Sequence, residues 1–251
     1  MSQADKATAF HALHVSGTPL VLYNIWDAGG AKTLAKAGAP AVATGSWSVA
    51  AAHGYKDGEA IPLDFALRVA ARIAATVDLP LTVDFEGGYA VDPATLSEHI
   101  TQLIDTGAVG LNFEDRVVGG AGLHAVDVQA DRIGAIRAAA DTAGVPLFIN
   151  ARTDLFLQSK PATHRDHLDA ALERAAAYAA VGASGFFVPG LTDLALIAEV
   201  VRGTSLPVNV MMMDPLTIAG ATEAGVARVS FGPAPYATAQ ADLAAAFQRL
   251  T

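Results

Sequence analysis

The stretch LPLTVDFEGGYA (79–90) sets the pattern from which the fold can be predicted. A short apolar run leads directly into two carboxylates, Asp84 and Glu86, and then into Gly87 and Gly88. Because side chains alternate along a strand, both acids are expected on the same side of the strand's carboxyl end. The two glycines allow a sharp turn and leave the space above it uncrowded. This stretch therefore predicts a buried strand that ends in an acidic turn.

Two further stretches repeat this design, GLNFEDR (110–116) and LFINARTD (147–154). Around them, strand-like and helix-like segments alternate along the whole chain. Strands are expected at 19–27, 40–46, 79–86, 108–115, 145–153, 184–190, 206–212 and 226–232. Helices are expected at 1–14, 28–38, 63–77, 92–107, 127–144, 163–183, 192–203, 215–225 and 237–250.

Eight strand–helix units in 251 residues predict an α/β fold, a (β/α)₈ barrel of the TIM type, with residues 1–251 forming a single domain. The nearly continuous apolar strands fit a parallel sheet that is covered on both faces. A doubly wound open sheet is the alternative, but AGGAKT (28–33) does not match its glycine-rich fingerprint. The least regular stretches, 46–62 and 115–127, both follow strands, so we expect these loops to carry the chemistry.

The composition narrows the class of partner. A net charge of −9 argues against nucleic acid and anionic membranes. No apolar run reaches the roughly 18–20 residues of a membrane span, and the first residues lack the basic start and apolar block of a signal peptide. A soluble, cytoplasmic protein is expected. The chain has no cysteine, which excludes disulfides, thiolate zinc sites and cysteine nucleophiles.

Closure of a barrel would bring several polar strand ends to one mouth, namely 45–47, Asp84, Glu86, Glu114 and Arg152. Carboxylates are the ligands that a hard divalent cation prefers. An arginine offers a fixed fork to a substrate carboxylate, and the backbone N–H groups of 45–47 can bind a second anionic oxygen. This combination predicts a site for a small 2-oxo acid.

Other polar residues near these strand ends are ambiguous. His124 can serve as an acid/base or anchor its loop, and Asn209 can face the ligand or the barrel interior. Asp115 and Arg116 are expected to form a structural pair. A hydroxyl proton could be taken only by Tyr23, His53, Tyr89 or His124.

With these motifs the chain resembles the isocitrate lyase / phosphoenolpyruvate mutase superfamily over nearly its whole length. The matching stretches are GSWSVAAAHGYKDGE (45–59), VDFEGGYA (83–90), NFEDR (112–116), LH (123–124) and NARTD (150–154). The resemblance implies a (β/α)₈ barrel that binds Mg²⁺, or alternatively Mn²⁺, and a 2-oxo or 2-hydroxy carboxylate. It also implies a homodimer or homotetramer that exchanges the last barrel helix between subunits.

The resemblance also implies roles for individual residues. Asp84 is similar to the direct metal ligand, Glu86 and Glu114 to acids that hold the metal through water, and Asp57 to the acid behind them. Together with the residues suggested above, the predicted substrate-binding residues are Gly45, Ser46, Trp47, Arg152 and Asn209. The predicted catalytic residues are Arg152, Glu114 and His124.

One departure from the family pattern bears on the reaction. Lyases of the family carry a Lys-Lys-Cys-Gly-His gating loop, whereas this chain has RVVGGAGLH (116–124). Cleavage that relies on the loop cysteine is therefore not expected. We expect a Mg²⁺-dependent lyase or decarboxylase that acts on an oxaloacetate-like acid through a metal-stabilised enolate. The alternatives are a phosphonopyruvate-type C–P hydrolase or mutase, and a family member that binds a 2-oxo acid without converting it.

Overall fold

The computed structural model describes residues 1–250 and confirms the predicted alternation of strands and helices. Within that range the strands are β1 (Leu20–Leu22), β2 (Val42–Ala43), β3 (Leu81–Asp84), β4 (Gly110–Glu114), β5 (Phe148–Arg152), β6 (Gly185–Phe187), β7 (Val208–Met211) and β8 (Arg228–Ser230). The helices are α1 (Gln3–Ala12), α2 (Ala28–Lys36), α3 (Ser46–Ala52), α4 (Leu63–Ala74), α5 (Pro93–Asp105), α6 (Val126–Thr142), α7 (Leu168–Ala180), α8 (Leu194–Gly203), α9 (Ile218–Glu223), α10 (Ala234–Gln248) and the 3₁₀ helix η1 (Pro161–His167).

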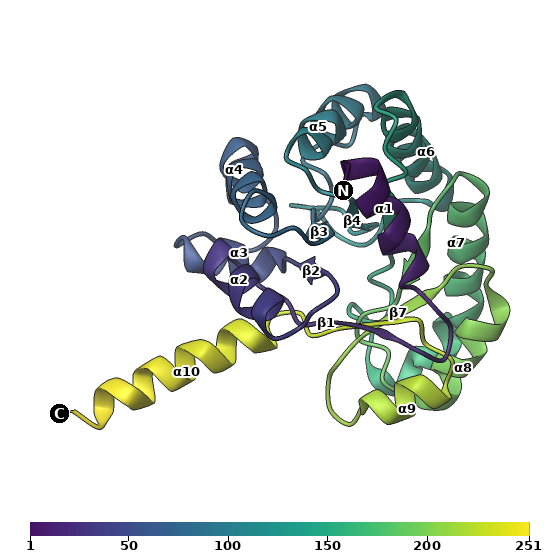
Figure 1. Cartoon of the computed structure of the whole chain (residues 1–251). Coiled ribbons are helices and arrows are strands. Elements are labelled where there is room, and N and C mark those ends of the chain that lie inside the picture. Colours follow the sequence, from purple (N-terminus) through teal and green to yellow (C-terminus); the bar gives the residue numbers. More distant parts are fainter. Residues whose placement is uncertain (251) are drawn as a thin grey trace.

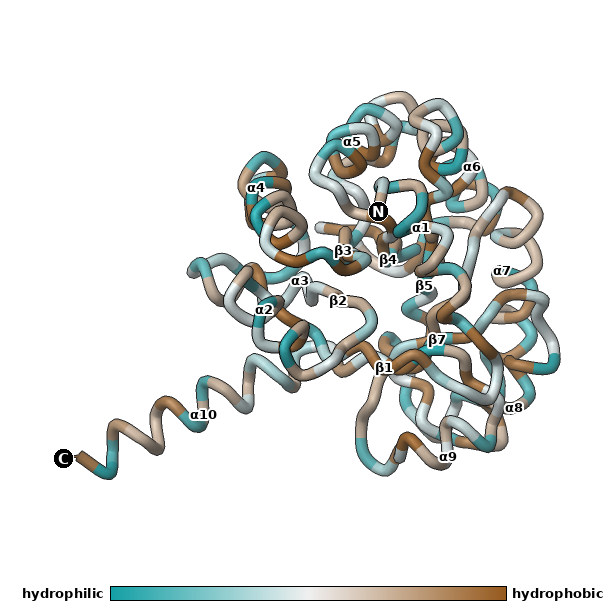
Figure 2. Tube along the Cα trace, in the orientation of Figure 1, coloured by the Kyte–Doolittle hydropathy of each residue, from teal (hydrophilic) through white to brown (hydrophobic). Residues whose placement is uncertain are grey.

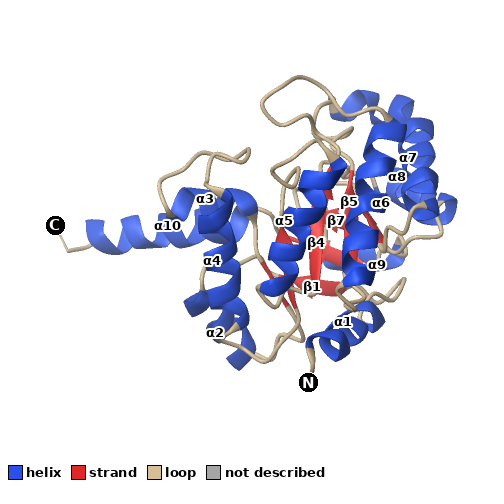
Figure 3. Ribbon diagram, turned by 90° about the horizontal axis from the view of Figure 1, so that it is seen from above, coloured by secondary structure: helices blue, strands red, loops and turns tan. Residues whose placement is uncertain are grey.

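The eight strands form one parallel sheet in the order β1-β8-β7-β6-β5-β4-β3-β2. Beyond the last residues of β1 and β2, a parallel bridge joins Ile25 to Thr44. There the Ile25 N–H donates to the Ala43 carbonyl at 2.9 Å, and the Gly45 N–H donates to the Ile25 carbonyl at 3.2 Å. The sheet thus closes on itself inside a layer of helices (Figures 1 and 3). This arrangement confirms the predicted (β/α)₈ barrel and excludes the open, doubly wound sheet.

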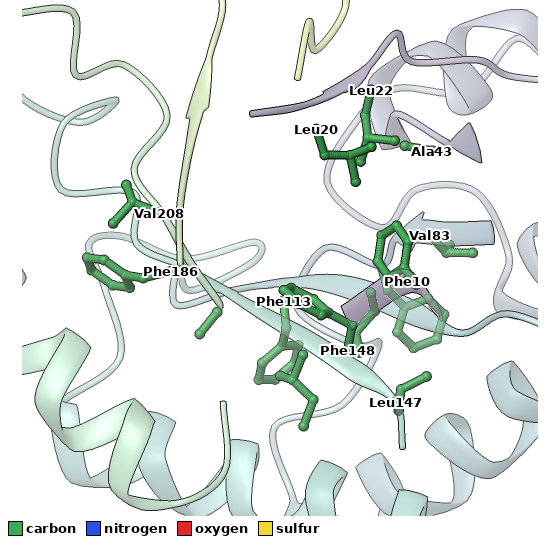
Figure 4. Close-up of a cluster of buried hydrophobic side chains, with 14 of the residues drawn as sticks. Phe10, Leu20, Leu22, Ala43, Val83, Phe113, Leu147, Phe148, Phe186 and Val208 are labelled. Carbon is green, nitrogen blue, oxygen red and sulfur yellow. The ribbon is translucent and has the colours of Figure 1, made fainter. Parts of the chain in front are cut away.

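Apolar side chains from the strands and from α1 fill the core (Figure 4). Phe10 of α1 is fully buried and packs edge to face on Phe148, with ring centroids 5.4 Å apart. His14, just after α1, stacks on the same ring at 3.9 Å. Phe10 also lies against Gly110. Because Gly110 and Phe148 begin β4 and β5, α1 covers the amino-terminal end of the barrel and leaves the carboxyl end open to ligands.

Helix boundaries follow the local sequence where a capping residue is present. The Asp92 carboxylate accepts a hydrogen bond from the Thr95 N–H at 2.9 Å, and Pro93 lies in the first turn of α5. The helix ends before Gly107, whose φ of +94° suits glycine. These are the start and stop that the sequence predicts for this helix.

Two helical segments differ from the sequence-based expectation. The stretch 46–62, expected to be irregular, contains α3, which has no side-chain cap and is held by burial of Ser48, Val49 and Ala50. The predicted helix at 163–183 begins instead with η1. Short helices of this kind depend on tertiary packing more than on propensity, so the sequence alone does not indicate them.

The last helix, α10, extends away from the barrel (Figure 1). Hydrophilic and hydrophobic residues alternate along it (Figure 2), and Leu243, Phe247 and Leu250 near its end are 65%, 65% and 85% exposed. Exposed apolar residues of this size commonly mark an interaction surface. Among the helices of residues 1–250, none combines the length and hydropathy that crossing a membrane requires.

Candidate active site

A cavity of about 210 Å³, partly open to solvent, lies at the carboxyl ends of the strands. Asp84, the last residue of β3, and Arg152, the last residue of β5, both line it. Asn112 of β4 lies opposite Asp84 in the sheet register and lines it as well. The remaining lining includes Asn24, Gly45, Ser46, Trp47, Asp57, Phe187, Met211 and Ser230. The cavity therefore gathers one acid, one arginine and one amide from three successive strands.

Two carboxylates hold the Arg152 guanidinium in place. Its Nε and Nη2 donate to the two oxygens of Asp154 at 2.6 and 3.0 Å, and its Nη1 lies 3.1 Å from Glu114 Oε2. Burial by itself would lower the pKa of Arg152, but Glu114 and Asp154 outweigh burial and raise that pKa above its ordinary value. Arg152 is consequently a rigid cation at the edge of the cavity.

Ser46, at the start of α3, joins two of the predicted acids. Its backbone N–H donates to Asp84 Oδ2 at 3.0 Å, and its hydroxyl donates to Asp57 Oδ1 at 3.2 Å. Burial and the neighbouring Asp84 raise the pKa of Asp57. The structure thus brings Asp57 and Asp84 together at the mouth, on either side of Ser46.

Glu86 and Glu114 lie deeper and are both nearly inaccessible. Glu86 adopts a left-handed backbone conformation (φ +51°), and its Oε2 accepts the N–H groups of Gly58 and Glu59, each at 2.8 Å. Burial, and then repulsion by Asp57 and Asp84, raise the pKa of Glu86 to about 8. Burial and neighbouring acids likewise raise the pKa of Glu114 to about 8, against the opposing effect of Arg152.

These acids fit a divalent cation in one particular way. Within residues 1–250, no three His, Cys, Asp or Glu side chains are close enough together to ligate one ion directly. Direct ligation of one ion by three of these carboxylates is therefore not what the geometry offers. One direct ligand, Asp84, with the other acids reached through water matches a small ion that keeps its hydration shell. Burial, and then repulsion between the acids, raise the pKa values of Glu86 and Glu114, and a cation would relieve that repulsion.

The amides predicted to bind the substrate carboxylate are partly engaged. The Gly45 N–H donates to Ile25, and the Ser46 N–H donates to Asp84. Within the described chain the Trp47 N–H has no hydrogen-bond partner. The Trp47 ring packs on Tyr236, with centroids 5.8 Å apart, and stays 41% exposed. Of the three predicted donors, the Trp47 amide is the one left for a ligand.

Two other predicted site residues lie away from this cavity. The His124 side chain lines a separate hollow with Glu59 and Arg132. Asn209 is buried in the barrel, where its Oδ1 accepts a long hydrogen bond, 3.5 Å, from the Ser230 hydroxyl. The structure therefore places Asn209 in the barrel interior, the second of the two positions considered from the sequence.

The expected pair between Asp115 and Arg116 is wrong. Asp115 is fully buried, and its Oδ2 accepts hydrogen bonds from Arg174 and Tyr178 of α7, both at 3.1 Å. Its Oδ1 accepts the Asp154 N–H at 3.0 Å. A neighbour in sequence points to the opposite side of an extended chain, which leaves Arg116 exposed while Asp115 supports the loop that carries Asp154.

Several polar residues at the site were not singled out from the sequence. Asp154 and Asn112 lie within the NARTD and NFEDR motifs. Their closeness in sequence to Arg152 and Glu114 could have identified them as site residues. Arg228 was detectable as a lone charge in the apolar run VARVSFG (226–232). The others are Asn24, which accepts the N–H groups of Phe231 and Gly232, and Asn150, which donates to Asn112.

Comparisons with known proteins show the family to which the chain belongs. The family model described as phosphoenolpyruvate phosphomutase matches residues 10–251. A crystal structure described as a candidate phosphonomutase from Burkholderia cenocepacia J2315 is 48% identical, covers all of both chains and superposes with a TM-score of 0.97.

Some of the curated relatives have named activities. The 2-methylisocitrate lyase of Escherichia coli is 31% identical over 214 residues, 83% of this chain and 70% of that protein. The oxaloacetate decarboxylase of a Bradyrhizobium strain is 31% identical over 141 residues, 55% of this chain and 46% of that protein. With a family model spanning nearly the whole chain, a matching fold and strand-end motifs at one cavity, the protein belongs to the phosphoenolpyruvate phosphomutase family, in the isocitrate lyase / phosphoenolpyruvate mutase superfamily of carbon–carbon lyases and mutases.

Proposed function

We propose that this protein is a Mg²⁺-dependent lyase or decarboxylase for a small 2-oxo carboxylate of the oxaloacetate type. The observation that carries the proposal is the Arg152 guanidinium, buried and held by Asp154 and Glu114, at the edge of the cavity that Asp84 also lines. A fixed arginine suits a carboxylate, and an acid opposite it suits a cation. The relatives named as a lyase and a decarboxylase support the same class of reaction.

The protein's own residues would act as follows. Arg152 binds the C1 carboxylate of the substrate and orients it, with the Trp47 N–H as a second donor. Asp84 would hold the cation directly, Glu86 and Glu114 would hold it through water, and Asp57 would lie behind them. When bound, the cation supplies Lewis acidity that polarises the 2-oxo group.

Decarboxylation of such a substrate requires few further groups. The bond between C3 and its carboxylate breaks, CO₂ leaves, and the electron pair remains on the three-carbon fragment as an enolate. C3 then takes a proton from water to give the 2-oxo acid product. Residues 116–124 contain no cysteine or lysine and His124 lines another hollow, so this loop places no acid–base side chain in the lining of the cavity. This absence favours decarboxylation over a cleavage that needs a positioned base.

Turnover of oxaloacetate tests the proposal. We expect pyruvate to form faster than in a solution of Mg²⁺ alone, and the enzymatic excess to disappear with EDTA and return with Mg²⁺ or Mn²⁺. In Arg152→Lys the charge remains but the two-pronged contact is lost, so kcat/KM should fall about 100-fold. Turnover that persists in EDTA, or that is unchanged in Arg152→Lys, would contradict the proposal.

The similarity to a candidate phosphonomutase favours one second function, chemistry at a C–P bond. Phosphonopyruvate in the same assay distinguishes the two, because release of phosphate, or formation of phosphoenolpyruvate, would identify a hydrolase or a mutase. The loop residues Val117, Val118, Gly119 and Gly120 offer no polar side chain to a phosphonyl group. We therefore expect neither product.

A further inference from the structure

A polar chain of three side chains runs through the barrel interior to the site. Asp84, Asn112 and Asn150 lie opposite one another in the register of β3, β4 and β5. Asn112 Oδ1 accepts hydrogen bonds from Asn150 Nδ2 at 2.8 Å and from Arg228 Nη2 at 3.0 Å. On the other side, Asn112 Nδ2 donates a long hydrogen bond, 3.4 Å, to Asp84 Oδ1.

The partners of Asn112 determine which way its amide points. A guanidinium carries five N–H donors and no acceptor, so the amide atom that faces Arg228 must be the oxygen. The NH₂ group is then directed toward Asp84, whose carboxylate oxygen accepts from it. Both ends of the contact therefore require the same orientation, and rotation of the amide by 180° would place donors against donors.

The amide has hydrogen-bonding capacity left over. An NH₂ group carries two N–H donors, and the structure gives Asn112 Nδ2 a single acceptor among residues 1–250, Asp84. Asn112 also lines the cavity shared by Asp84, Ser46 and Arg152. One N–H of a buried, fixed amide is thus available at the inner wall of the site.

Burial of the Arg228 side chain is energetically unfavourable, and its guanidinium has few hydrogen-bond partners. It is 1% exposed, it forms no ion pair within the described chain, and its Nε and Nη1 have no hydrogen-bond partner there. Among residues 1–250, its guanidinium has one hydrogen-bond partner, Asn112 Oδ1. Burial of an incompletely paired charge opposes folding, so the position is poorly explained by stability and better explained by its effect on Asn112.

We propose that Asn112 is a substrate-binding residue that donates a hydrogen bond to an anionic oxygen of the 2-oxo carboxylate, and that Arg228 is a positioning residue that holds the amide in this orientation. The inference rests on the proposed function and extends it by a fixed donor within the site. Such a donor stabilises negative charge that develops on the substrate oxygen without having to reorient during the reaction.

Binding of oxalate in the presence of Mg²⁺, measured by calorimetry, is the direct test. Oxalate is a planar dianion whose neighbouring oxygens resemble those of a 2-oxo carboxylate. Asn112→Leu keeps the size of the side chain but removes the donor, so we expect its Kd to rise about 10-fold or more. Asn112→Ser, whose hydroxyl can still accept from Arg228 but is shorter, should lose a similar amount and serves if the leucine variant fails to fold.

A double-mutant cycle tests the role of Arg228. Arg228→Met should weaken oxalate binding when Asn112 is present and have no further effect in the Asn112→Ser background. Arg228→Lys keeps a donor toward Oδ1 and should restore most of the affinity, whereas a purely structural role would appear in the melting temperature and not in this coupling.

The outcomes separate the two proposals. If the wild-type protein binds no oxalate with Mg²⁺, the proposed function fails and this inference fails with it. If the wild type binds and the Asn112 variants bind within twofold of it, only this inference is wrong. Equal effects of Arg228→Met in both backgrounds would overturn the positioning role alone.

Discussion

Gly88 occupies the turn directly after the acidic strand end and has no room for a side chain. Its φ is +79°, and a Cβ there would lie 2.5 Å from Leu96 and 3.1 Å from Phe113. We predict that Gly88→Ala destabilises the protein by about 2–4 kcal/mol, because backbone strain adds to overpacking. Urea denaturation measures the loss.

Gly119 is the matched control for that substitution. Its φ of +71° is similar, but nothing lies within 4 Å of a Cβ built on it. Gly119→Ala should therefore cost only the backbone strain, about 1 kcal/mol. Equal losses for the two variants would show that packing against Leu96 and Phe113 contributes nothing.

Asp115 is the buried acid on which the loop around Asp154 depends. Removing its carboxylate would leave the Arg174 guanidinium, 11% exposed, without its charge partner. We predict that Asp115→Ala lowers the free energy of unfolding by about 3–5 kcal/mol, the usual cost of breaking a buried ion pair. Arg116→Gln, at an exposed neighbour, should change it by less than about 0.5 kcal/mol. The opposite ranking in denaturant titrations would restore the pair expected from the sequence.

At the scale of an element, the segment after α1 links stability to pH. His14 Nδ1 donates to the Phe10 carbonyl at 2.8 Å, so Nε2 is the unprotonated nitrogen, and it is buried without a partner within the described residues. Burial, and then the charge of Arg228, lower the pKa of His14 to about 3. The unfolded chain binds a proton there below about pH 6.5, whereas the folded protein does not.

Stability should consequently fall as the pH drops from 6.5 toward 3. The unfolded state binds more protons over this window, so the free energy of unfolding rises with pH. Between pH 7.5 and 5.5 we predict that the wild type loses about 1 kcal/mol more than His14→Phe, which keeps the stacking on Phe148. Urea denaturation at both pH values gives this difference. Parallel pH profiles would show that His14 does not contribute.

Some helices and strands could be predicted from the sequence, and others could not. The strands and long helices can be predicted from apolar runs and periodicity, because the spacing of apolar residues indicates which side chains are buried. The predicted bounds were too long by several residues at most strands, as for 19–27 against Leu20–Leu22, because hydrogen bonding in the closed sheet decides where a strand ends. α3 was missed because its stability comes from neighbours distant in sequence.

At the scale of the whole molecule, the exposure of α10 indicates that copies of the protein assemble through this helix. Only Pro235 of this 15-residue helix is buried in the described chain, which fits the helix exchange implied by the family resemblance. We predict a homodimer or homotetramer by light scattering after size exclusion. Leu243→Glu combined with Phe247→Glu should shift it to a smaller species, because charges would occupy the apolar face.

The control for this experiment lies on the same helix. Gln248→Glu adds a charge without removing an apolar side chain, and should leave the assembly intact. A monomeric wild type, or an unchanged mass in the double variant, would show that α10 does not join subunits.

The order of residues by itself determined the barrel and the strand-end motifs, because apolar periodicity and the acids and arginine that follow each strand are local properties. It also placed Asp84 and Arg152 at one mouth. Only the tertiary structure decided that Arg152 is held by Asp154 and Glu114, that Asp115 pairs with Arg174, and that Arg228 donates a hydrogen bond to Asn112. These contacts join residues up to 116 positions apart, and their partners are selected by barrel closure and desolvation, which no local pattern encodes.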